Sequence, residues 1–188
     1  IGILDEWVRR TAMTRCIELG LTDKNFILDV NVSPTMNFNT VFIDNLLKMI
    51  DEINYPKDKL NLEITESEKM NFTEENLSGL NKLHEEGIHL SLDDFGTGYS
   101  SFNNLVNIPA KALKTERAFI LGIENNEYLQ FLLQEMVRIA HRLNMTLIVE
   151  GVETAEQQQL LSSYGVDYLQ GYLFSKPLSL LLIPISEP

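Results

Sequence analysis

Short apolar runs alternate with helical stretches along most of the chain. Runs rich in Val, Ile, Leu and Phe predict strands at residues 26–32, 60–65, 88–92, 112–116, 147–149 and 168–174. Apolar residues spaced three or four apart predict helices at residues 7–20, 41–53, 73–84, 102–106, 127–143 and 154–165. Strands that alternate with helices in this way are typical of parallel β/α units.

Local signals support several of these elements. The first helix is predicted to be amphipathic from the spacing of its apolar residues, which are Trp7, Val8, Ala12, Cys16 and Ile17. Thr73 is expected to cap the third helix, because a threonine hydroxyl can accept a hydrogen bond from a free backbone N–H. Thr154 followed by Gln157 predicts a capping box at the start of the last helix.

The strand count bears on the fold class. We expect an α/β fold of the TIM-type (β/α)8 barrel in a modified form, as a single domain over residues 1–188. Six predicted strands are two short of eight, and a barrel of this kind typically has about 250 residues. The chain also opens on a helix, whereas this architecture normally opens on a strand. The first one or two strands are therefore predicted to be missing from the N-terminus of this chain.

Composition then narrows the function. The 188 residues include 15 Lys and Arg against 27 Asp and Glu, a formal net charge of −12, and 44% are hydrophobic. Such an acidic surface does not bind a nucleic-acid backbone by counterion release, so we expect neither DNA nor RNA as a partner. A single cysteine, Cys16, excludes a disulfide framework and a cysteine zinc site. No apolar run is long enough to span a bilayer, so a cytoplasmic domain without membrane contact is expected.

Polar residues recur where the predicted strands end. One of them lies in or at the end of each strand, amid Val, Ile and Leu: Asn31, Glu63, Asp93, Lys114, Glu150 and Gln170. Side chains alternate across a strand, so Lys114 and Glu116 are expected to share a face. A carboxylate in such surroundings is costly unless it is paired or binds metal. One such residue on each successive strand predicts a ring at the C-terminal mouth of a barrel, where active sites of this fold lie.

The charges within that ring indicate what it binds. Two carboxylates about 4 Å apart repel by roughly 4 kcal/mol at an effective dielectric near 20, and Lys114 supplies only one positive charge. Carboxylate and amide oxygens suit Mg²⁺, Mn²⁺ or Ca²⁺. Two such ions about 3.5–4 Å apart would clamp a phosphodiester and activate water near neutral pH. A pair of cations would thereby reconcile an acidic protein with an anionic substrate.

Simpler interpretations remain open at this point. Asp93 and Asp94, followed by Gly96-Thr97-Gly98, are also consistent with a capped turn and nothing more. Lys114 is also consistent with a solvated charge at a strand end. Asp94-Phe95-Gly96 matches the metal loop of protein kinases, but no glycine-rich loop precedes it.

In combination, five motifs resemble one known family. They are Asn31-Val32-Ser33, Leu62-Glu63-Ile64-Thr65-Glu66-Ser67, Asp93-Asp94-Phe95-Gly96-Thr97-Gly98-Tyr99-Ser100-Ser101, Glu150-Gly151-Val152-Glu153-Thr154 and Gln170-Gly171-Tyr172. In order and spacing they are similar to the EAL family of cyclic-di-GMP phosphodiesterases, over nearly the whole chain. The resemblance implies a modified TIM barrel that hydrolyses cyclic di-GMP to the linear dinucleotide pGpG with Mg²⁺ or Mn²⁺.

The resemblance also implies a role for each matching residue. Asn31, Glu63 and Asp93 would be metal ligands, and Asp94 would be a ligand of a second metal. Lys114 would hold the attacking water or a phosphate oxygen, and Glu150 would be a base or a metal contact. The remaining matches would line or support the site: Glu66, Glu116, Glu153 and Gln170. In this family the loop that spans residues 93–98 also couples the site to dimerisation, which implies a homodimer.

Two departures from the family pattern stand out. The Glu-Ala-Leu signature, whose glutamate is normally a metal ligand, is absent from this chain, which agrees with the strands expected to be missing. The family usually has Lys-Ile-Asp where this chain has Lys114-Thr115-Glu116. Glu116 keeps the charge but is one methylene longer.

Two other functions stay open as alternatives. A catalytically inactive cyclic-di-GMP receptor or protein-interaction module could use the same scaffold. For either function, other domains could anchor the parent protein to a membrane. An enolase-like barrel also places Lys and carboxylates around Mg²⁺ at strand ends. The enolase reading does not explain the Asp-Asp-Phe-Gly-Thr-Gly loop.

Overall fold

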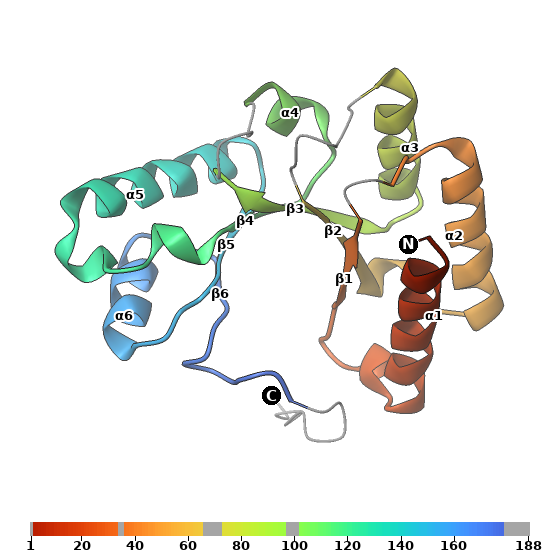
Figure 1. Cartoon of the computed structure of the whole chain (residues 1–188), viewed down its shortest axis with the longest axis horizontal. Coiled ribbons are helices and arrows are strands. Elements are labelled where there is room, and N and C mark those ends of the chain that lie inside the picture. The colour runs from red at the N-terminus through yellow and green to blue at the C-terminus, as the bar shows by residue number, and fades with distance from the viewer. Residues whose placement is uncertain (1, 34–35, 66–72, 97–101, 179–188) are drawn as a thin grey trace.

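Six parallel strands form one sheet at the centre of the molecule (Figure 1). The structure is a computed structural model that describes residues 2–33, 36–65, 73–96 and 102–178. The strands are β1 (Leu28–Val32), β2 (Leu60–Thr65), β3 (His89–Phe95), β4 (Ala112–Thr115), β5 (Thr146–Val149) and β6 (Tyr168–Leu169). Each strand pairs with the next in chain order, so β1 and β6 are the two edges and hydrogen bonds do not close the sheet over the described residues. The arrangement confirms the α/β fold of parallel units predicted from the sequence.

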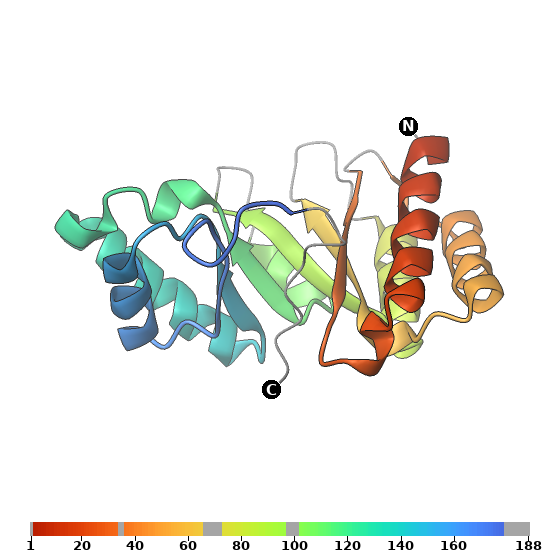
Figure 2. The same cartoon turned by 90° about the horizontal axis from the view of Figure 1, so that it is seen from below.

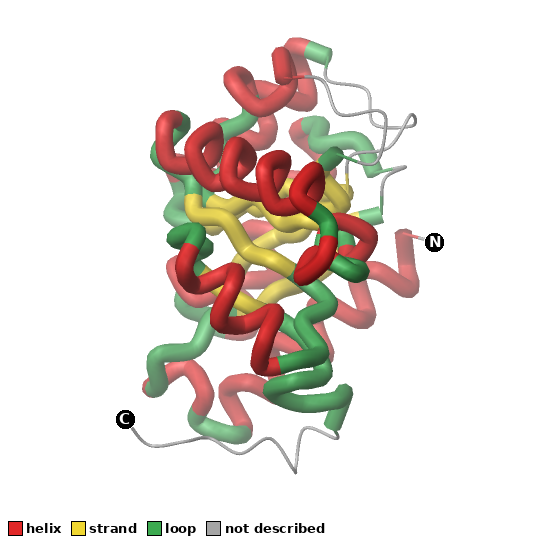
Figure 3. The backbone as a smooth tube through the Cα atoms, turned by 90° about the vertical axis from the view of Figure 1, so that its left-hand side faces the viewer, coloured by secondary structure: helices red, strands yellow, loops and turns green. Residues whose placement is uncertain are grey.

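Helices cover the outer, convex side of the curved sheet (Figures 1 and 2). They are α1 (Gly2–Glu18), α2 (Thr40–Ile53), α3 (Glu74–Glu85), α4 (Phe102–Asn107), α5 (Glu127–Arg142) and α6 (Ala155–Ser163). Short 3₁₀ turns lie at Leu21–Asp23, Lys57–Lys59, Arg117–Phe119 and Ile123–Asn125. Seen along the sheet in Figure 3, the strands lie inside a layer of helices. None of the helices in the described part of the chain is both long and apolar enough to cross a membrane.

The hydrophobic core lies between the sheet and these helices. Alternation on β2 shows how it forms: Leu60, Leu62 and Ile64 are almost completely buried among core residues. The residues between them are polar, Asn61 and Glu63. Strand alternation therefore sends apolar side chains outward to the helices and polar side chains to the inner, concave face.

Capping predictions are confirmed at both tested helices. The Thr73 hydroxyl accepts a hydrogen bond from the backbone N–H of Asn76, at 3.2 Å. Thr154 and Gln157 form a capping box, in which the Gln157 side chain accepts from the backbone N–H of Thr154. Each cap joins residues only three positions apart in the chain, so it can be predicted from the local sequence.

Two predicted strands differ from those observed by three residues or more at one end. The run at 168–174 is a strand only at Tyr168–Leu169, because the chain turns at Gly171, whose carbonyl accepts a hydrogen bond from the Phe174 N–H. In the other case β3 is longer than predicted and extends through Asp93 and Asp94 to Phe95.

The buried face of α1 also differs from the predicted apolar stripe. Trp7, Val8 and Ile17 are exposed, whereas Arg9 and Met13 are buried together with Cys16. The buried residues are spaced four and three apart, so they form one stripe along the helix. Apolar residues occur around most of α1, and the sequence pattern therefore does not select the face that packs.

Candidate active site

Lys114 lies at the centre of a cluster of acidic side chains on the inner face of the sheet. Its ammonium nitrogen donates a hydrogen bond to Glu63 Oε1, lies 2.6 Å from Glu150 Oε1 and is 3.9 Å from Asp93 Oδ1. These partners come from β2, from β3 and from the residue that follows β5. Only 4% of Lys114 is exposed, so it is not the solvated strand-end charge considered as an alternative.

The ion pairs determine the charge of Lys114. Burial alone would lower its pKa, but the hydrogen bonds with Glu150 and Glu63 outweigh this and raise the pKa above the usual lysine value. Lys114 is therefore an ammonium throughout the physiological range. Burial raises the pKa of Glu63 despite the attraction of Lys114.

The register of the sheet positions these residues. Asn31 on β1 is the Cα partner of Glu63 on β2, and Thr65 is the partner of Asp93 on β3. Parallel strands in register bring side chains with the same orientation to the same level of the inner face. Asn31 is exposed and lies beside Glu63 by register, so it stands at the edge of the cluster.

Asp93 and Asp94 occupy an irregular end of β3. Pairing with β4 is regular up to Leu92 and resumes at Phe95, which partners Thr115 after a shift in register. Asp94 has a positive φ of 55°, a conformation in which Asp is better tolerated than most residues. Burial raises the pKa of Asp94, and the neighbouring charges of Asp93, Glu116 and Glu150 raise it further. The irregularity thus places two consecutive carboxylates at the same strand end.

The other predicted site residues lie around the cluster. Glu116 is exposed and lies one residue beyond β4 with an extended backbone, and its charge raises the pKa of Asp94. Glu153 is paired with Arg117, at 2.7 Å. Gln170 is exposed, and its backbone carbonyl accepts a hydrogen bond from the Val152 N–H at 3.0 Å. Glu66 lies outside the described residues.

A row of polar side chains lies one level below the cluster. Asn61 Nδ2 donates to Asp29 Oδ1 at 2.7 Å and to Ser91 Oγ at 2.8 Å, which links three consecutive strands. Asn61 precedes Glu63 by two positions on β2, and Ser91 precedes Asp93 by two positions on β3, so each lies on the same strand face as the site residue that follows it. We did not predict this row, although the alternation of Asn61 with Leu60 and Leu62 is a signal for it.

The donor set fits a divalent cation. Glu63, Asp93 and Glu150 bring three carboxylates to one ammonium, which leaves an excess of negative charge among oxygen donors alone. As the side chains stand, the described residues contain no group of three Asp, Glu, His or Cys arranged to hold a metal, because these carboxylates face Lys114.

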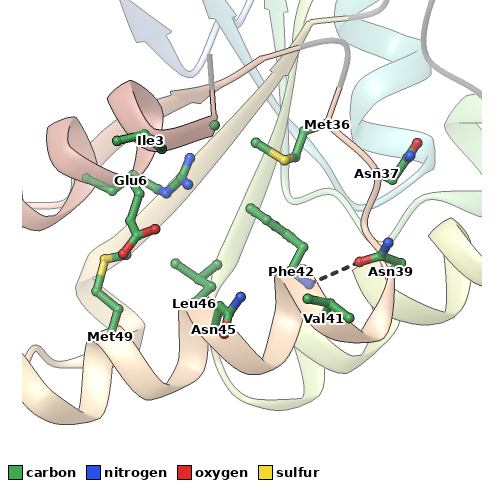
Figure 4. Close-up of a pocket in the computed structure, with 12 residues that line it drawn as sticks. Ile3, Glu6, Met36, Asn37, Asn39, Val41, Phe42, Asn45, Leu46 and Met49 are labelled. Carbon is green, nitrogen blue, oxygen red and sulfur yellow. Dashed lines mark hydrogen bonds between the residues drawn. The ribbon is translucent and has the colours of Figure 1, made fainter.

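The cavity drawn in Figure 4 is a separate feature of the molecule. It lies between α1 and α2, has a volume of about 560 Å³ and is lined by Ile3, Phe42 and Leu46 among others. Arg9 also lines it, with its guanidinium carbon 5.4 Å from the centroid of the Phe42 ring. No member of the strand-end cluster lines this cavity.

Comparison with known proteins identifies the family. The sequence profile of the EAL domain matches residues 1–177. The chain belongs to the EAL-domain family. Its similarity to a curated EAL relative, the cyclic di-GMP phosphodiesterase NbdA of Pseudomonas aeruginosa, is 34% identity over 96% of this chain. That match spans 23% of NbdA, and the chain spans about a quarter of the length of curated relatives of this kind.

Solved structures of EAL proteins have the same fold. The EAL domain of Mycobacterium smegmatis DcpA superposes with a TM-score of 0.86 at 33% identity, covering 94% of this chain and 80% of that one. A calcium and cyclic-di-GMP complex of Klebsiella pneumoniae BlrP1 superposes with a TM-score of 0.82 at 27% identity, covering 92% and 44%. The chain therefore has the TIM-like barrel fold of EAL domains.

Two residues that contact the EAL site loops were missed from the sequence. Arg117 and Phe119 lie in the 3₁₀ turn after β4, against the backbone of Gly151 and Gly96. Each glycine follows a site carboxylate by one or two positions. The only sequence signal was the glycine itself, since the contacts join segments more than 20 residues apart.

Proposed function

We propose that the chain forms a metal-dependent phosphodiesterase domain that hydrolyses cyclic di-GMP to linear pGpG. The observation that carries this proposal is the buried Lys114 ammonium, surrounded by Glu63, Asp93 and Glu150 on the strand ends of an EAL domain. An EAL relative is named as a cyclic di-GMP phosphodiesterase, and a BlrP1 structure contains this dinucleotide with calcium. The proposal treats residues 1–188 as one domain of this kind.

In the proposed reaction, water adds to phosphorus while the bond to the 3′ oxygen breaks. The products carry a 5′ phosphate and a free 3′ hydroxyl, whose proton comes from solvent. Glu150 is half-buried at the strand end and accepts the proton of the attacking water. Lys114 neutralises charge that develops on the phosphate oxygens. Its raised pKa keeps the ammonium available for this role.

Divalent cations complete the site in this proposal. Asn31, Glu63, Asp93 and Asp94 would hold them, and Mg²⁺ or Mn²⁺ would polarise the phosphodiester and lower the pKa of water. Glu116, Glu153 and Gln170 would support the site from its rim. The predicted dimer contact through the loop at residues 93–98 stays a prediction, since 97–101 lie outside the described residues.

Hydrolysis of cyclic di-GMP by the purified protein tests the proposal. We expect pGpG to appear by liquid chromatography with Mg²⁺ or Mn²⁺, and to disappear when EDTA removes the metal. Assays with Ca²⁺ compare a cation that fits the same oxygen donors but a looser geometry. Glu63→Gln and Asp93→Asn should each lower kcat about 10²-fold or more, because each removes a charged ligand of the proposed cations.

Glu52→Gln is the matched control, because Glu52 is a half-exposed carboxylate that pairs with Arg10 on the helical layer. Its turnover should equal that of the wild-type protein. Unchanged turnover in Glu63→Gln and Asp93→Asn would refute the site. Calorimetry that shows cyclic di-GMP binding without any hydrolysis would instead support the receptor function.

A further inference from the structure

The turn that follows β4 contacts both the end of β3 and the loop after β5, the two segments that carry Asp93, Asp94 and Glu150. This segment, residues 116–120, is called the β4 turn below. It begins two residues after Lys114 and contains the 3₁₀ helix Arg117–Phe119. Among the described residues, no hydrogen bond or ion pair joins its side chains to the Lys114 cluster. Glu116 acts on Asp94 through its charge, and Arg117 and Phe119 act through the segments on which they pack.

Phe119 packs against Gly96, directly after the end of β3 that carries Asp93 and Asp94. A Cβ atom added to Gly96 would lie 2.5 Å from Cζ of Phe119, far closer than real Cβ contacts. Gly96 also has a positive φ of 97°, which favours glycine. The edge of the ring therefore lies directly against the backbone of Gly96, two residues after Asp94, and blocks movement of this end of β3 toward the β4 turn.

Arg117 packs in the same way against the loop that carries Glu150. A Cβ atom on Gly151 would lie 2.5 Å from Cγ of Arg117, at a φ of 79°. The guanidinium then reaches Glu153, with a distance of 2.7 Å between Nη2 and Oε1. The aliphatic part of Arg117 thus lies against Gly151, and its guanidinium binds Glu153.

The β4 turn is itself attached to the start of α6. Gln157 is buried, and its Nε2 donates to the Ile120 carbonyl at 3.4 Å. The Oε1 atom of the same side chain accepts from the Glu153 N–H at 2.8 Å. The Glu150 loop is consequently held to the β4 turn through both Arg117 and Gln157.

From these contacts we infer that Arg117 and Phe119 are positioning residues for the reaction proposed above. Phe119 fixes the end of β3 that carries Asp94, and Arg117 fixes the loop that carries Glu150, each by close packing on a glycine. The inference rests on the proposed function for its kinetic test, but the geometry makes predictions that need no turnover.

The kinetic test compares two variants of Arg117. Arg117→Ala removes both the packing on Gly151 and the ion pair, and should lower kcat about tenfold to a hundredfold with little change in KM, because Glu150 is misplaced. Arg117→Met keeps an aliphatic chain of similar length and should retain most of kcat, since the exposed ion pair contributes little.

The matched control is Arg138→Ala, which removes an exposed arginine paired with Glu135 on α5. Its kcat should equal that of the wild-type protein. Because Arg117 is largely exposed, all three variants should unfold at similar urea concentrations, which separates positioning from global stability. A wild-type kcat in Arg117→Ala would overturn the role of Arg117.

Two measurements are independent of turnover. In Phe119→Leu, Mn²⁺ should bind several-fold more weakly by calorimetry, because Asp94 is displaced, while in Arg117→Ala it should bind as in the wild type. In protein labelled with ¹⁵N-lysine, the Lys114 ammonium signal should shift in Arg117→Ala, because its hydrogen bond with Glu150 changes.

These results separate the two hypotheses. If the wild-type protein does not hydrolyse cyclic di-GMP but the Lys114 signal and Mn²⁺ affinity change as stated, the function fails and the positioning role stands. If hydrolysis occurs and neither variant differs from the wild type in kcat, in Mn²⁺ affinity or in the Lys114 signal, the positioning role alone fails.

Discussion

Two cationic side chains in this protein are equally buried but differ in their surroundings. Lys114 and Arg9 are each 4% exposed. Lys114, at the strand ends, faces three carboxylates, and its hydrogen bonds with Glu150 and Glu63 raise its pKa. Arg9, between two helices, has no hydrogen-bond acceptor at Nε or Nη1 in the described part of the structure, and burial lowers its pKa.

The difference separates Lys114, whose burial belongs to a candidate site, from Arg9, whose burial only lowers the stability of the fold. Removing a charge from water is unfavourable in both places. At Lys114 direct ion pairs compensate for it, whereas at Arg9 burial outweighs the attraction of Asp5 and Glu6. Phe42 offers Arg9 a ring face at 5.4 Å, which is a weaker interaction than an ion pair. Burial of a charge therefore indicates a site only when its partners converge from several elements, as they do at Lys114.

The largest expected effect comes from removing the paired cation. Lys114→Met should lower the free energy of unfolding of the metal-free protein by about 3–5 kcal/mol, because it leaves Glu63 and its neighbours uncompensated. Urea denaturation measures this, and added Mg²⁺ should restore part of the loss. Lys82→Met, which removes an exposed lysine paired with Asp44, is the control and should cost less than about 1 kcal/mol. A Lys114→Met protein as stable as the control would contradict the comparison.

Removing Arg9, whose Nε and Nη1 lack hydrogen-bond acceptors, should have the opposite effect on the free energy of unfolding. Arg9→Met preserves most of the side-chain volume and eliminates buried donors without acceptors, so the free energy of unfolding should rise by about 1–3 kcal/mol. Its control is Arg10→Met on the same helix, which removes a half-exposed guanidinium paired with Glu52 and should change stability little. A loss of stability in Arg9→Met would show that Arg9 has a stabilising partner.

The smallest predicted effect is on how the free energy of unfolding depends on pH, and it comes from Glu63, which pairs with Lys114. Because burial raises the pKa of Glu63, the folded protein binds that proton more tightly than the unfolded chain. The stability contributed by Glu63 is therefore present below its ordinary pKa of 4.5 and is lost as pH rises through the raised value. Glu63→Gln should flatten this part of the stability profile in metal-free protein.

Glu86 provides the contrast for that profile. Its hydrogen bond with Lys57 lowers its pKa, so its contribution is present above 4.5 and is lost as pH falls. Glu86→Gln should therefore remove a loss of stability that occurs as pH falls, at a more acid pH than the Glu63 effect. Identical profiles for the two variants would show that the two carboxylates do not differ as their surroundings require.

The sequence was sufficient for features that local patterns determine. β2 spans the predicted residues 60–65, because Leu60, Leu62 and Ile64 alternate with polar side chains. The same alternation placed Glu63 and Lys114 on one face, and the order of parallel strands then brought them together. Most of the fold and the centre of the candidate site follow from such patterns.

Features that depend on packing between distant segments were not predictable. The burial of Arg9 depends on which face of α1 meets α2, and the apolar residues of α1 do not select that face. The contacts of Arg117 with Gly151, and of Phe119 with Gly96, join separate loops. The irregular end of β3 arises from its pairing with β4, so Asp94 offered no local sign of its conformation.

That conformation affects how mutagenesis of the loop should be read. Alanine is disfavoured at the positive φ of Asp94, whereas asparagine tolerates it and preserves the shape of the carboxylate. An alanine scan would therefore combine a backbone penalty with the loss of a charge at Asp94, but not at Asp93. Asparagine at both positions is the substitution that compares their chemistry on equal terms.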